Sequence, residues 1–202
     1  MLFRSDRGVN GLELTIGFVA GAVNGTLVRG RAETRIGAVS TDSRSMQPGD
    51  LFVALRGDRF DGHAFVDAAF EHGAVAAVVL RRAGLAPQTR WEAPVIEVDD
   101  TLQALQDLAH AVRIASGSRV IAITGSAGKT TTKETIADFL SARYRVVKNK
   151  GNLNNHIGLP LSLMQLRERP DVAVMELGMN HSGEIRTLVG VAEPDVRVWT
   201  NV

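Results

Sequence analysis

The sequence predicts an α/β protein in which mostly parallel sheets are covered by helices. Three observations favour this class: short apolar runs recur along the chain, helical patterns lie between several of them, and turn residues bound both. The expected strands are 35–40, 51–55, 75–80, 95–98, 120–124, 172–176 and 196–201. The expected helices are 64–72, 102–116, 130–143, 157–166 and 184–191, with a short buried helix over 16–23.

The length of 202 residues allows one large domain or two small ones. A boundary is expected near residue 117, because Ser116-Gly117-Ser118 follows a long amphipathic helix and precedes a new strand. The predicted domains are therefore 1–117 and 118–202. The second is expected to be a parallel-sheet nucleotide-binding domain of the phosphate-loop type.

Composition excludes several classes of function. The 23 Lys and Arg against 22 Asp and Glu leave a net charge of +1 without a basic block, which disfavours nucleic-acid binding. The absence of cysteine excludes disulfides, thiolate nucleophiles and Cys-ligated zinc, and fits a reducing cytoplasm. The apolar stretch 16–23 is too short to span a bilayer and is a poor secretion signal. We therefore expect a cytoplasmic protein without a membrane span.

A Gly-rich turn between the strand 120–124 and the next helix is the strongest motif in the chain. Glycines let backbone N–H groups surround phosphate oxygens, and the helix N-terminus adds its dipole. The motif is shorter than the usual G-x-x-x-x-G-K-[ST], because position 123 is Ile, and the loop does not distinguish ATP from GTP. The alternative is an ordinary turn capped by a threonine. The expected ATP-binding residues are Gly125, Ser126, Ala127, Gly128, Lys129, Thr130 and Thr131.

Glu176 is the candidate Mg²⁺ ligand together with the hydroxyl of Thr130. It ends the apolar strand 172–176, and carboxyl ends of parallel strands are where ligands bind in open α/β sheets. The alternative is an ordinary polar residue at the end of a strand.

Polar loops supply further candidates. Amides in the loop 148–158 can contact phosphate or substrate, or can simply cap the helix that follows. His156 and His181 could carry protons, although loop histidines are more often solvated. In the first domain, 41–44 and 56–63 are strand ends of the kind that line ligand crevices, or turns stabilised by Asp and Ser side chains.

Taken together, these motifs resemble the Mur ligase family. The segments that carry the resemblance are 124–134, 151–160 and 176–185 in the second domain and 42–44, 49–57 and 60–63 in the first. The first domain resembles the family's UDP-sugar-binding domain, and the resemblance extends over nearly the whole chain from about Leu12.

The resemblance implies an ATP-dependent ligase of peptidoglycan precursor synthesis that uses ATP and Mg²⁺. A tripeptide carboxylate on UDP-N-acetylmuramoyl-tripeptide would attack the γ-phosphate, and the amine of D-Ala-D-Ala would then displace phosphate from the acyl phosphate. The resemblance implies Lys129 and Asn155 as catalytic residues and Thr130 and Glu176 as metal ligands. It implies substrate contacts by Ser43, Arg44, Asp61, His63 and Asn154.

Within the family, Thr-Thr-Lys-Glu after Thr130 and the Asn-Leu-Asn-Asn loop favour the ligase that adds D-Ala-D-Ala. Another ligase of this family and a stand-alone nucleotide-binding module remain alternatives, whereas Asp42-Ser43-Arg44 argues against a folyl-polyglutamate ligase. The resemblance implies three domains in family members, together with a further Mg²⁺-binding histidine and a carbamylated lysine. The segments that would carry this histidine, this lysine and the C-terminal domain are not found in the 202 residues. We therefore expect a truncated ligase, inactive alone, with an uncovered sheet edge near its C-terminus.

Overall fold

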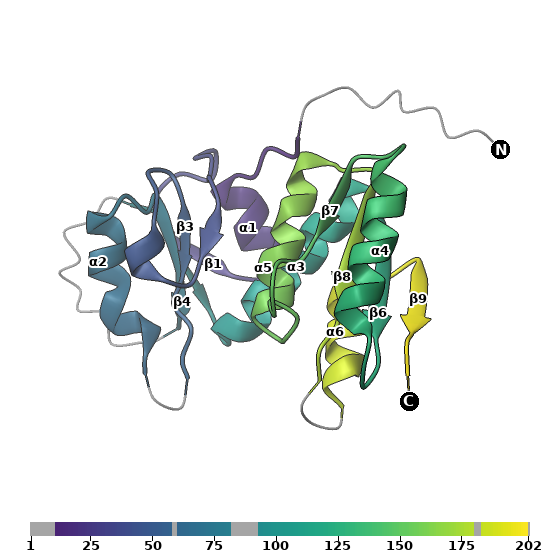
Figure 1. Cartoon of the computed structure of the whole chain (residues 1–202). Helices are drawn as coiled ribbons and strands as arrows, with labels where there is room; N and C mark the ends of the chain where they lie inside the picture. The colour runs from purple at the N-terminus through teal and green to yellow at the C-terminus, as the bar shows by residue number, and fades with distance from the viewer. Residues whose placement is uncertain (1–10, 58–59, 82–92, 180–182, 202) are drawn as a thin grey trace.

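The structure is a computed structural model that describes residues 11–57, 60–81, 93–179 and 183–201. It contains two sheets, one built from residues 26–98 and the other from residues 119–199. Helices lie between the sheets and on their outer faces (Figure 1). This architecture confirms the predicted α/β class with parallel sheets.

The first sheet has the strand order β1-β5-β4-β3-β2. Its strands are β1 (Thr26–Arg29), β2 (Val39–Ser40), β3 (Leu51–Val53), β4 (Ala76–Leu80) and β5 (Val95–Val98). The pairs β2–β3, β3–β4 and β4–β5 are parallel, and β1 adds to β5 antiparallel. The expected strand 35–40 is therefore mostly an extended segment, of which only Val39 and Ser40 pair in the sheet.

The second sheet has the order β7-β8-β6-β9, and all of its pairs are parallel. Its strands are β6 (Arg119–Thr124), β7 (Val146–Lys148), β8 (Val172–Glu176) and β9 (Val196–Trp199). The sequence pattern missed β7 and β1. A three-residue strand offers no alternation to detect, and β1 is largely exposed, so that its apolar pattern is weak.

The α-helices agree with the expected positions. They are α1 (Ile16–Ala22), α2 (Val66–Glu71), α3 (Thr101–Ser116), α4 (Lys129–Ser141), α5 (Gly158–Leu163) and α6 (Glu184–Ala192). Three 3₁₀ turns complete the described structure: η1 (Ser43–Ser45), η2 (Gly62–Phe65) and η3 (Met164–Glu168).

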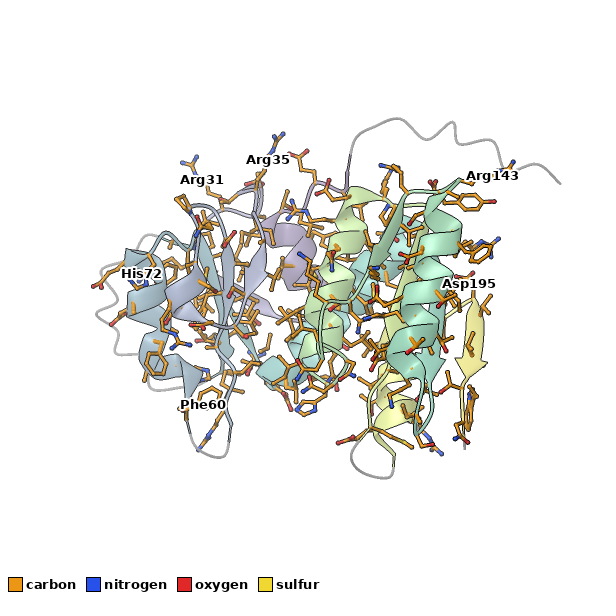
Figure 2. All side chains as sticks on the ribbon, viewed as in Figure 1. Arg31, Arg35, Phe60, His72, Arg143 and Asp195 are labelled. Carbon is orange, nitrogen blue, oxygen red and sulfur yellow. The ribbon has the colours of Figure 1, made fainter. Side chains whose placement is uncertain are left out.

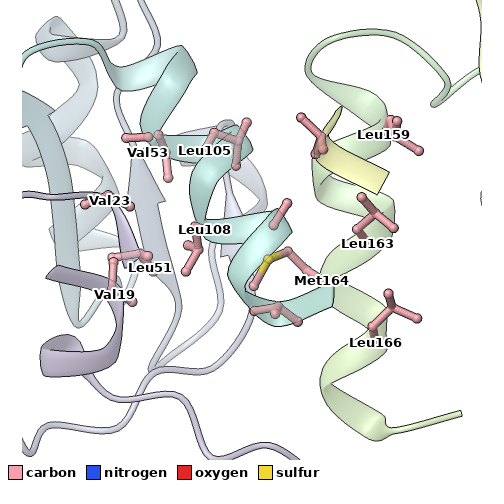
Figure 3. Packing of buried hydrophobic residues seen from close by; sticks show 14 of the residues in the cluster. Val19, Val23, Leu51, Val53, Leu105, Leu108, Leu159, Leu163, Met164 and Leu166 are labelled. Carbon is pink, nitrogen blue, oxygen red and sulfur yellow. The ribbon is translucent and has the colours of Figure 1, made fainter. Parts of the chain in front are cut away.

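Helix α3 lies between the two sheets and gives them a common core. Asp100 accepts hydrogen bonds from Leu102 N and Gln103 N at its start, and Gly117 ends it with φ 65°. Leu105 and Leu108 on this helix belong to one buried cluster (Figure 3). The cluster also contains Leu51 and Val53 of β3 and Leu159, Leu163 and Leu166 of α5 and η3. Residue 117, the predicted domain boundary, thus follows a helix that packs against both halves.

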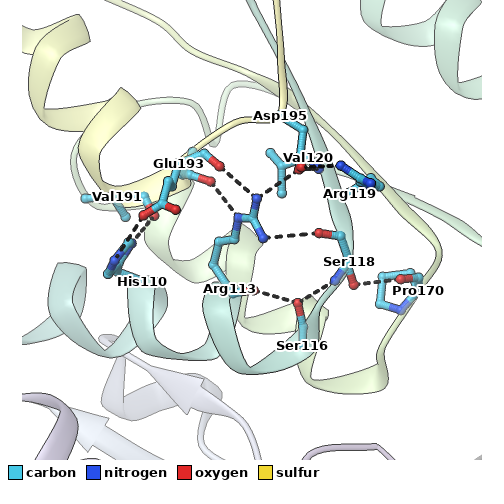
Figure 4. Close-up of polar contacts among 11 residues, drawn as sticks. His110, Arg113, Ser116, Ser118, Arg119, Val120, Pro170, Val191, Glu193 and Asp195 are labelled. Atoms are coloured by element: carbon cyan, nitrogen blue, oxygen red, sulfur yellow. Dashed lines mark hydrogen bonds and ion pairs between the residues drawn. The ribbon is translucent and has the colours of Figure 1, made fainter. Parts of the chain in front are cut away.

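A polar network anchors the C-terminal end of α3 to the second sheet (Figure 4). The buried guanidinium of Arg113 donates to Ala192 O at 3.0 Å, Ser118 O at 3.2 Å and Glu193 O at 2.8 Å. The guanidinium also forms an ion pair at 2.9 Å with the carboxylate of Asp195. This carboxylate accepts further hydrogen bonds from Val120 N and from the Arg119 side chain. These bonds join α3, β6 and the connection between α6 and β9.

Strand β9 lies at one edge of the second sheet. It pairs with β6, and the side chains of Val196 and Trp199 are half or more exposed. No helix within the described ranges is both long enough and apolar enough to cross a membrane.

We predict that Arg113→Met lowers the free energy of unfolding by about 3–5 kcal/mol, because it leaves Asp195 and several carbonyls without their buried donor. Arg119→Met is the matched control, because it removes an exposed donor to the same carboxylate and is expected to cost about 1 kcal/mol or less. Urea unfolding measures both, and equal losses would contradict the role given to Arg113.

The same network makes stability depend on pH. Burial raises the pKa of Asp195, but the hydrogen bonds from Val120 and Arg119 and the charge of Arg113 outweigh burial and leave the pKa below its ordinary value. The folded state therefore gains stability from this carboxylate above its ordinary pKa and loses it on acidification through the lowered pKa. Asp195→Asn should flatten this acid limb of the stability profile measured by urea unfolding.

Candidate functional site

The turn between β6 and α4 has the backbone geometry of a phosphate-binding loop. Gly125 and Gly128 have φ of 140° and 79°, values that side chains with a Cβ rarely adopt. A Cβ on Gly125 would lie 2.4 Å from Thr200 Oγ1. Helix α4 begins at Lys129, and within the described residues no side chain caps it. Its first N–H groups are therefore available to an anion.

Lys129 lies on the loop itself. Its ammonium donates to Gly125 O at 2.6 Å. The end of β9 packs on the same loop, because Thr200 N donates to Thr124 O at 3.0 Å and Ser126 N donates to Asn201 O at 3.1 Å. The sequence offered no sign of the contribution of Thr200 and Asn201, which depends on the pairing of β6 with β9.

The carboxylate of Glu176 lies beside the start of α4. Ile123 is opposite Glu176 in the parallel β6–β8 pair, which brings the two strand ends together. Thr130 Oγ1 donates to Glu176 Oε2 at 2.8 Å, and Asn154 Nδ2 donates to Oε1 at 2.9 Å. Glu176 is 4% exposed. A buried carboxylate and a hydroxyl at hydrogen-bond distance are oxygen donors of the kind that Mg²⁺ takes beside nucleotide phosphates.

These donors fit Mg²⁺ better than a metal that needs a full set of protein ligands. The described ranges contain no group of three or more His, Cys, Asp or Glu side chains placed to hold a metal ion. Mg²⁺ commonly uses one or two protein oxygens and takes its remaining ligands from phosphates and water.

The main chain of Glu176 is held by a residue that the motif reading did not single out. Asn149 Oδ1 accepts from Glu176 N at 2.9 Å, and Asn149 Nδ2 donates to Glu176 O at 3.0 Å. The same amide donates to Leu153 O at 3.0 Å. Asn149 directly follows β7, so its side chain continues the pairing of β7 with β8 beyond the last backbone pair.

Asn154 and Asn155 are neighbours with different contacts. Asn154 contacts Glu176, and Gly178 leaves room for it, because a Cβ there would lie 2.7 Å from the Asn154 amide. Asn155 Oδ1 accepts from Gly158 N at 2.8 Å and from Ile157 N at 3.1 Å. The proposed catalytic residue Asn155 is thus engaged in capping α5, and Asn154, predicted to contact substrate, binds the candidate metal ligand.

Of the two loop histidines, only His156 lies within the described residues, and its side chain is not part of the Glu176 cluster. The main-chain oxygen of His156 accepts from Gln106 Nε2 at 3.2 Å, and its side chain is exposed. His181 falls outside the described residues.

A second polar group lies at the carboxyl ends of β2, β3 and β4. Arg44 donates to both carboxylate oxygens of Asp42, at 2.9 and 2.7 Å, and hydrogen bonding to Arg44 lowers the pKa of Asp42 to about 2. Ser43 is buried, and its carbonyl oxygen lies 2.9 Å from His72 Nδ1. The guanidinium of Arg44 remains exposed to solvent.

Asp61 and His63 form the other part of this group. The Asp61 carboxylate accepts hydrogen bonds from His63 N and from His63 Nδ1. Both bonds lower the pKa of Asp61, and the bond from the backbone N–H has the larger effect. His63 Nε2 accepts from Leu80 N at 2.9 Å. Both ring nitrogens of His63 are therefore used within the protein, which favours a role in shaping the loop around Asp61.

Two family models match the chain. The Mur ligase family catalytic domain matches residues 35–113, and the Mur ligase middle domain matches residues 123–202. Between them they include both polar groups described above. The chain belongs to the Mur ligase family.

Among curated relatives, the chain is similar to UDP-N-acetylmuramoyl-tripeptide–D-alanyl-D-alanine ligases. It is 48% identical to that of Bacillus subtilis over 95% of its own length and 41% of the relative's. It is 41% identical to that of Escherichia coli over 95% of its own length and 40% of the relative's. The chain thus spans about two fifths of the length of these relatives.

Solved structures of ligases also match this chain. The UDP-N-acetylmuramoylalanyl-D-glutamyl-2,6-diaminopimelate–D-alanyl-D-alanyl ligase of Acinetobacter baumannii matches with a TM-score of 0.84 and 37% identity. The match covers 96% of this chain and 42% of that one. The MurF ligase of Thermotoga maritima, solved with ADP, matches with a TM-score of 0.71 and 34% identity over 82% of this chain and 37% of its own.

The capping bonds of Asn155 predict that Asn155→Ala lowers the free energy of unfolding by about 1 kcal/mol. Asn155→Asp keeps an acceptor oxygen at the helix start and should retain that stability. Urea unfolding compares the two variants. Equal stability of the alanine and aspartate variants would show that the cap contributes nothing.

Proposed function

We propose that the chain forms the UDP-sugar-binding and ATP-binding parts of a ligase that joins D-Ala-D-Ala to UDP-N-acetylmuramoyl-tripeptide. The observation that carries this proposal is the pairing of Glu176 with Thr130 at the start of α4, a helix whose N-terminus follows a glycine loop and has no side-chain cap among the described residues. The names of the relatives, and the ADP in the Thermotoga maritima structure, support the same assignment.

In this proposal the loop 125–131 binds the phosphates of ATP. The N–H groups at the start of α4 face phosphate oxygens, and Lys129 moves from Gly125 O to the β- and γ-phosphates. Thr130 and Glu176 hold Mg²⁺, which offsets negative charge on the phosphates. The loop and Lys129 orient the γ-phosphate toward the substrate carboxylate that attacks it.

Attack of the carboxylate on the γ-phosphate displaces ADP and forms an acyl phosphate. The amine of D-Ala-D-Ala then attacks the acyl carbon, loses a proton and displaces phosphate as the amide forms. This step belongs to the ATP-dependent acid–amino-acid ligases. Asn154 orients the Glu176 carboxylate, and Asn155, at the start of α5, is proposed to contact substrate or phosphate with the amide nitrogen that its cap does not use. We expect the reaction to take place in the cytoplasm, where ATP is available.

The polar group of the first sheet is the proposed binding site for the uridine nucleotide. Arg44 offers an exposed guanidinium to a diphosphate, while Ser43, Asp61 and His63 line the same sheet edge. In Figure 2, Phe60 beside this group lies at the bottom of the view and Arg143, beyond the end of α4, lies at the top. The start of α4 thus faces the same side as Phe60, as one substrate extending to both sites requires.

The ATP site is tested by Lys129→Met. Loss of a charged donor to phosphate should raise the Kd for Mg-ATP more than about tenfold, measured by calorimetric titration. Lys148→Met is the control, because this lysine lies on β7 and, within the described residues, forms its ion pairs with Glu134 and Asp138 of α4. If the two variants bind Mg-ATP equally well, the loop does not bind the phosphates through Lys129.

The uridine-nucleotide site is tested by Arg44→Ala. The variant should bind UDP-N-acetylmuramoyl-tripeptide about tenfold more weakly, because a charge-assisted bond to phosphate is lost. Arg31→Ala removes the same charge from an exposed position after β1 and should leave the affinity unchanged. Binding that is insensitive to Arg44 would overturn the assignment of the first domain.

A further inference from the structure

Lys133 on α4 is a buried cation that the proposed chemistry does not use. Its residue exposure is 1%, which places it among the most buried large side chains of the chain. Its ammonium donates to the main-chain oxygen of Asn149 at 3.0 Å and lies 3.2 Å from Glu134 Oε1. Burying an ammonium is costly, so a lysine in this position requires a specific compensation.

The partners of Lys133 lead directly to the candidate metal ligand. Asn149, itself 1% exposed, forms two side-chain bonds with the main chain of Glu176. The Glu176 carboxylate is in turn bonded to Thr130, which lies one helical turn before Lys133 on α4. The four residues therefore form a closed circuit of contacts joining α4, the end of β7 and the end of β8.

Two other contacts explain why the circuit depends on Lys133. The backbone pairing of β7 with β8 ends at Lys148 and Val174, and beyond it the Asn149 side chain joins the end of β7 to the main chain of Glu176. Lys148 also joins β7 to α4, but its ammonium does so through the partly or fully exposed carboxylates of Glu134 and Asp138. Lys133 is thus the buried link that holds the Asn149 main chain against α4.

We infer that Lys133 is a positioning residue that acts through Asn149 to hold the Glu176 carboxylate where it and Thr130 can bind Mg²⁺ on the nucleotide. This inference deepens the proposed function and rests on it. Lys133 does not contact phosphate in this arrangement. Its effect is on the metal-dependent part of nucleotide binding, because Lys129 and the loop N–H groups do not depend on the circuit.

The test measures the affinity of the chain for ATP with Mg²⁺ and with EDTA. Lys133→Met keeps about the length of the apolar lysine stem and removes the ammonium. In this variant the gain in ATP affinity from Mg²⁺ should fall about tenfold, which is typical of removing a partner that orients a metal ligand. The affinity in EDTA should stay unchanged. Asn149→Asp, which sets an oxygen against Glu176 O and Leu153 O in place of a donor, should have the same effect.

Two controls separate this role from general loss of stability. Lys148→Met removes the ion pairs of Lys148 with Glu134 and Asp138, and Glu134→Gln removes both ion pairs of Glu134, with Lys133 and with Lys148. Both variants leave the bond from Lys133 to Asn149, and both should keep the full gain from Mg²⁺. Hydrogen exchange of the Glu176 amide provides a readout without nucleotide, and it should become faster in Lys133→Met and stay slow in both controls.

The outcomes are distinct. An unaltered chain that fails to bind ATP overturns the proposed function and this inference with it. An unaltered chain that binds Mg-ATP, with variants at Lys133 and Asn149 that keep the full gain from Mg²⁺, overturns this inference alone. A Lys133→Met chain that is unfolded by circular dichroism leaves the decision to Asn149→Asp and to the amide exchange of Glu176 in Lys133→Gln.

Discussion

The parallel pairing of β6 with β8 is the constraint on which the candidate nucleotide site depends. It sets Ile123 opposite Glu176, so the strand that leads into the glycine loop and the strand that carries the carboxylate end at the same level. Every contact of the candidate metal group follows from this register. Thr130 reaches Glu176 because α4 starts one loop after β6, and Asn154 reaches it from the segment that follows β7. A shift of one residue would turn the Glu176 side chain to the other face of the sheet.

The shared core around α3 provides the second constraint. Leu105 and Leu108 belong to the same buried cluster as β3 on one side and α5 on the other. The buried guanidinium of Arg113 then joins the end of this helix to the connection before β9. The polar group of the first sheet and the Glu176 group of the second sheet therefore lie in parts of the chain that share one buried core, as the proposed binding of one substrate to both groups requires.

Sequence reasoning located the candidate site where its residues are contiguous. The strand, glycines, lysine and threonine of the glycine loop are consecutive, and the structure places Thr130 beside Glu176, as their positions in the motifs suggested. It was incomplete where a residue acts through a distant partner. Lys133 lies in the segment 124–134 and Asn149 in the loop 148–158, but the sequence marked neither as a site residue. They are 16 residues apart, and their contact exists only after β7 and α4 pack together. Thr200 and Asn201 likewise reach the loop only through the β6–β9 pair.

The sequence by itself determined the α/β class, most of the helices and strands, the position of the glycine loop between β6 and α4, and membership in the Mur ligase family. These features depend on apolar periodicity and on contiguous motifs, both of which can be recognised from residues close together in the sequence. Only the tertiary structure decided that α3 is common to both halves, that Asn155 caps α5, and that His63 has both ring nitrogens engaged. Burial and hydrogen-bond partners belong to pairs of residues brought together by folding, and no single position along the chain carries that information.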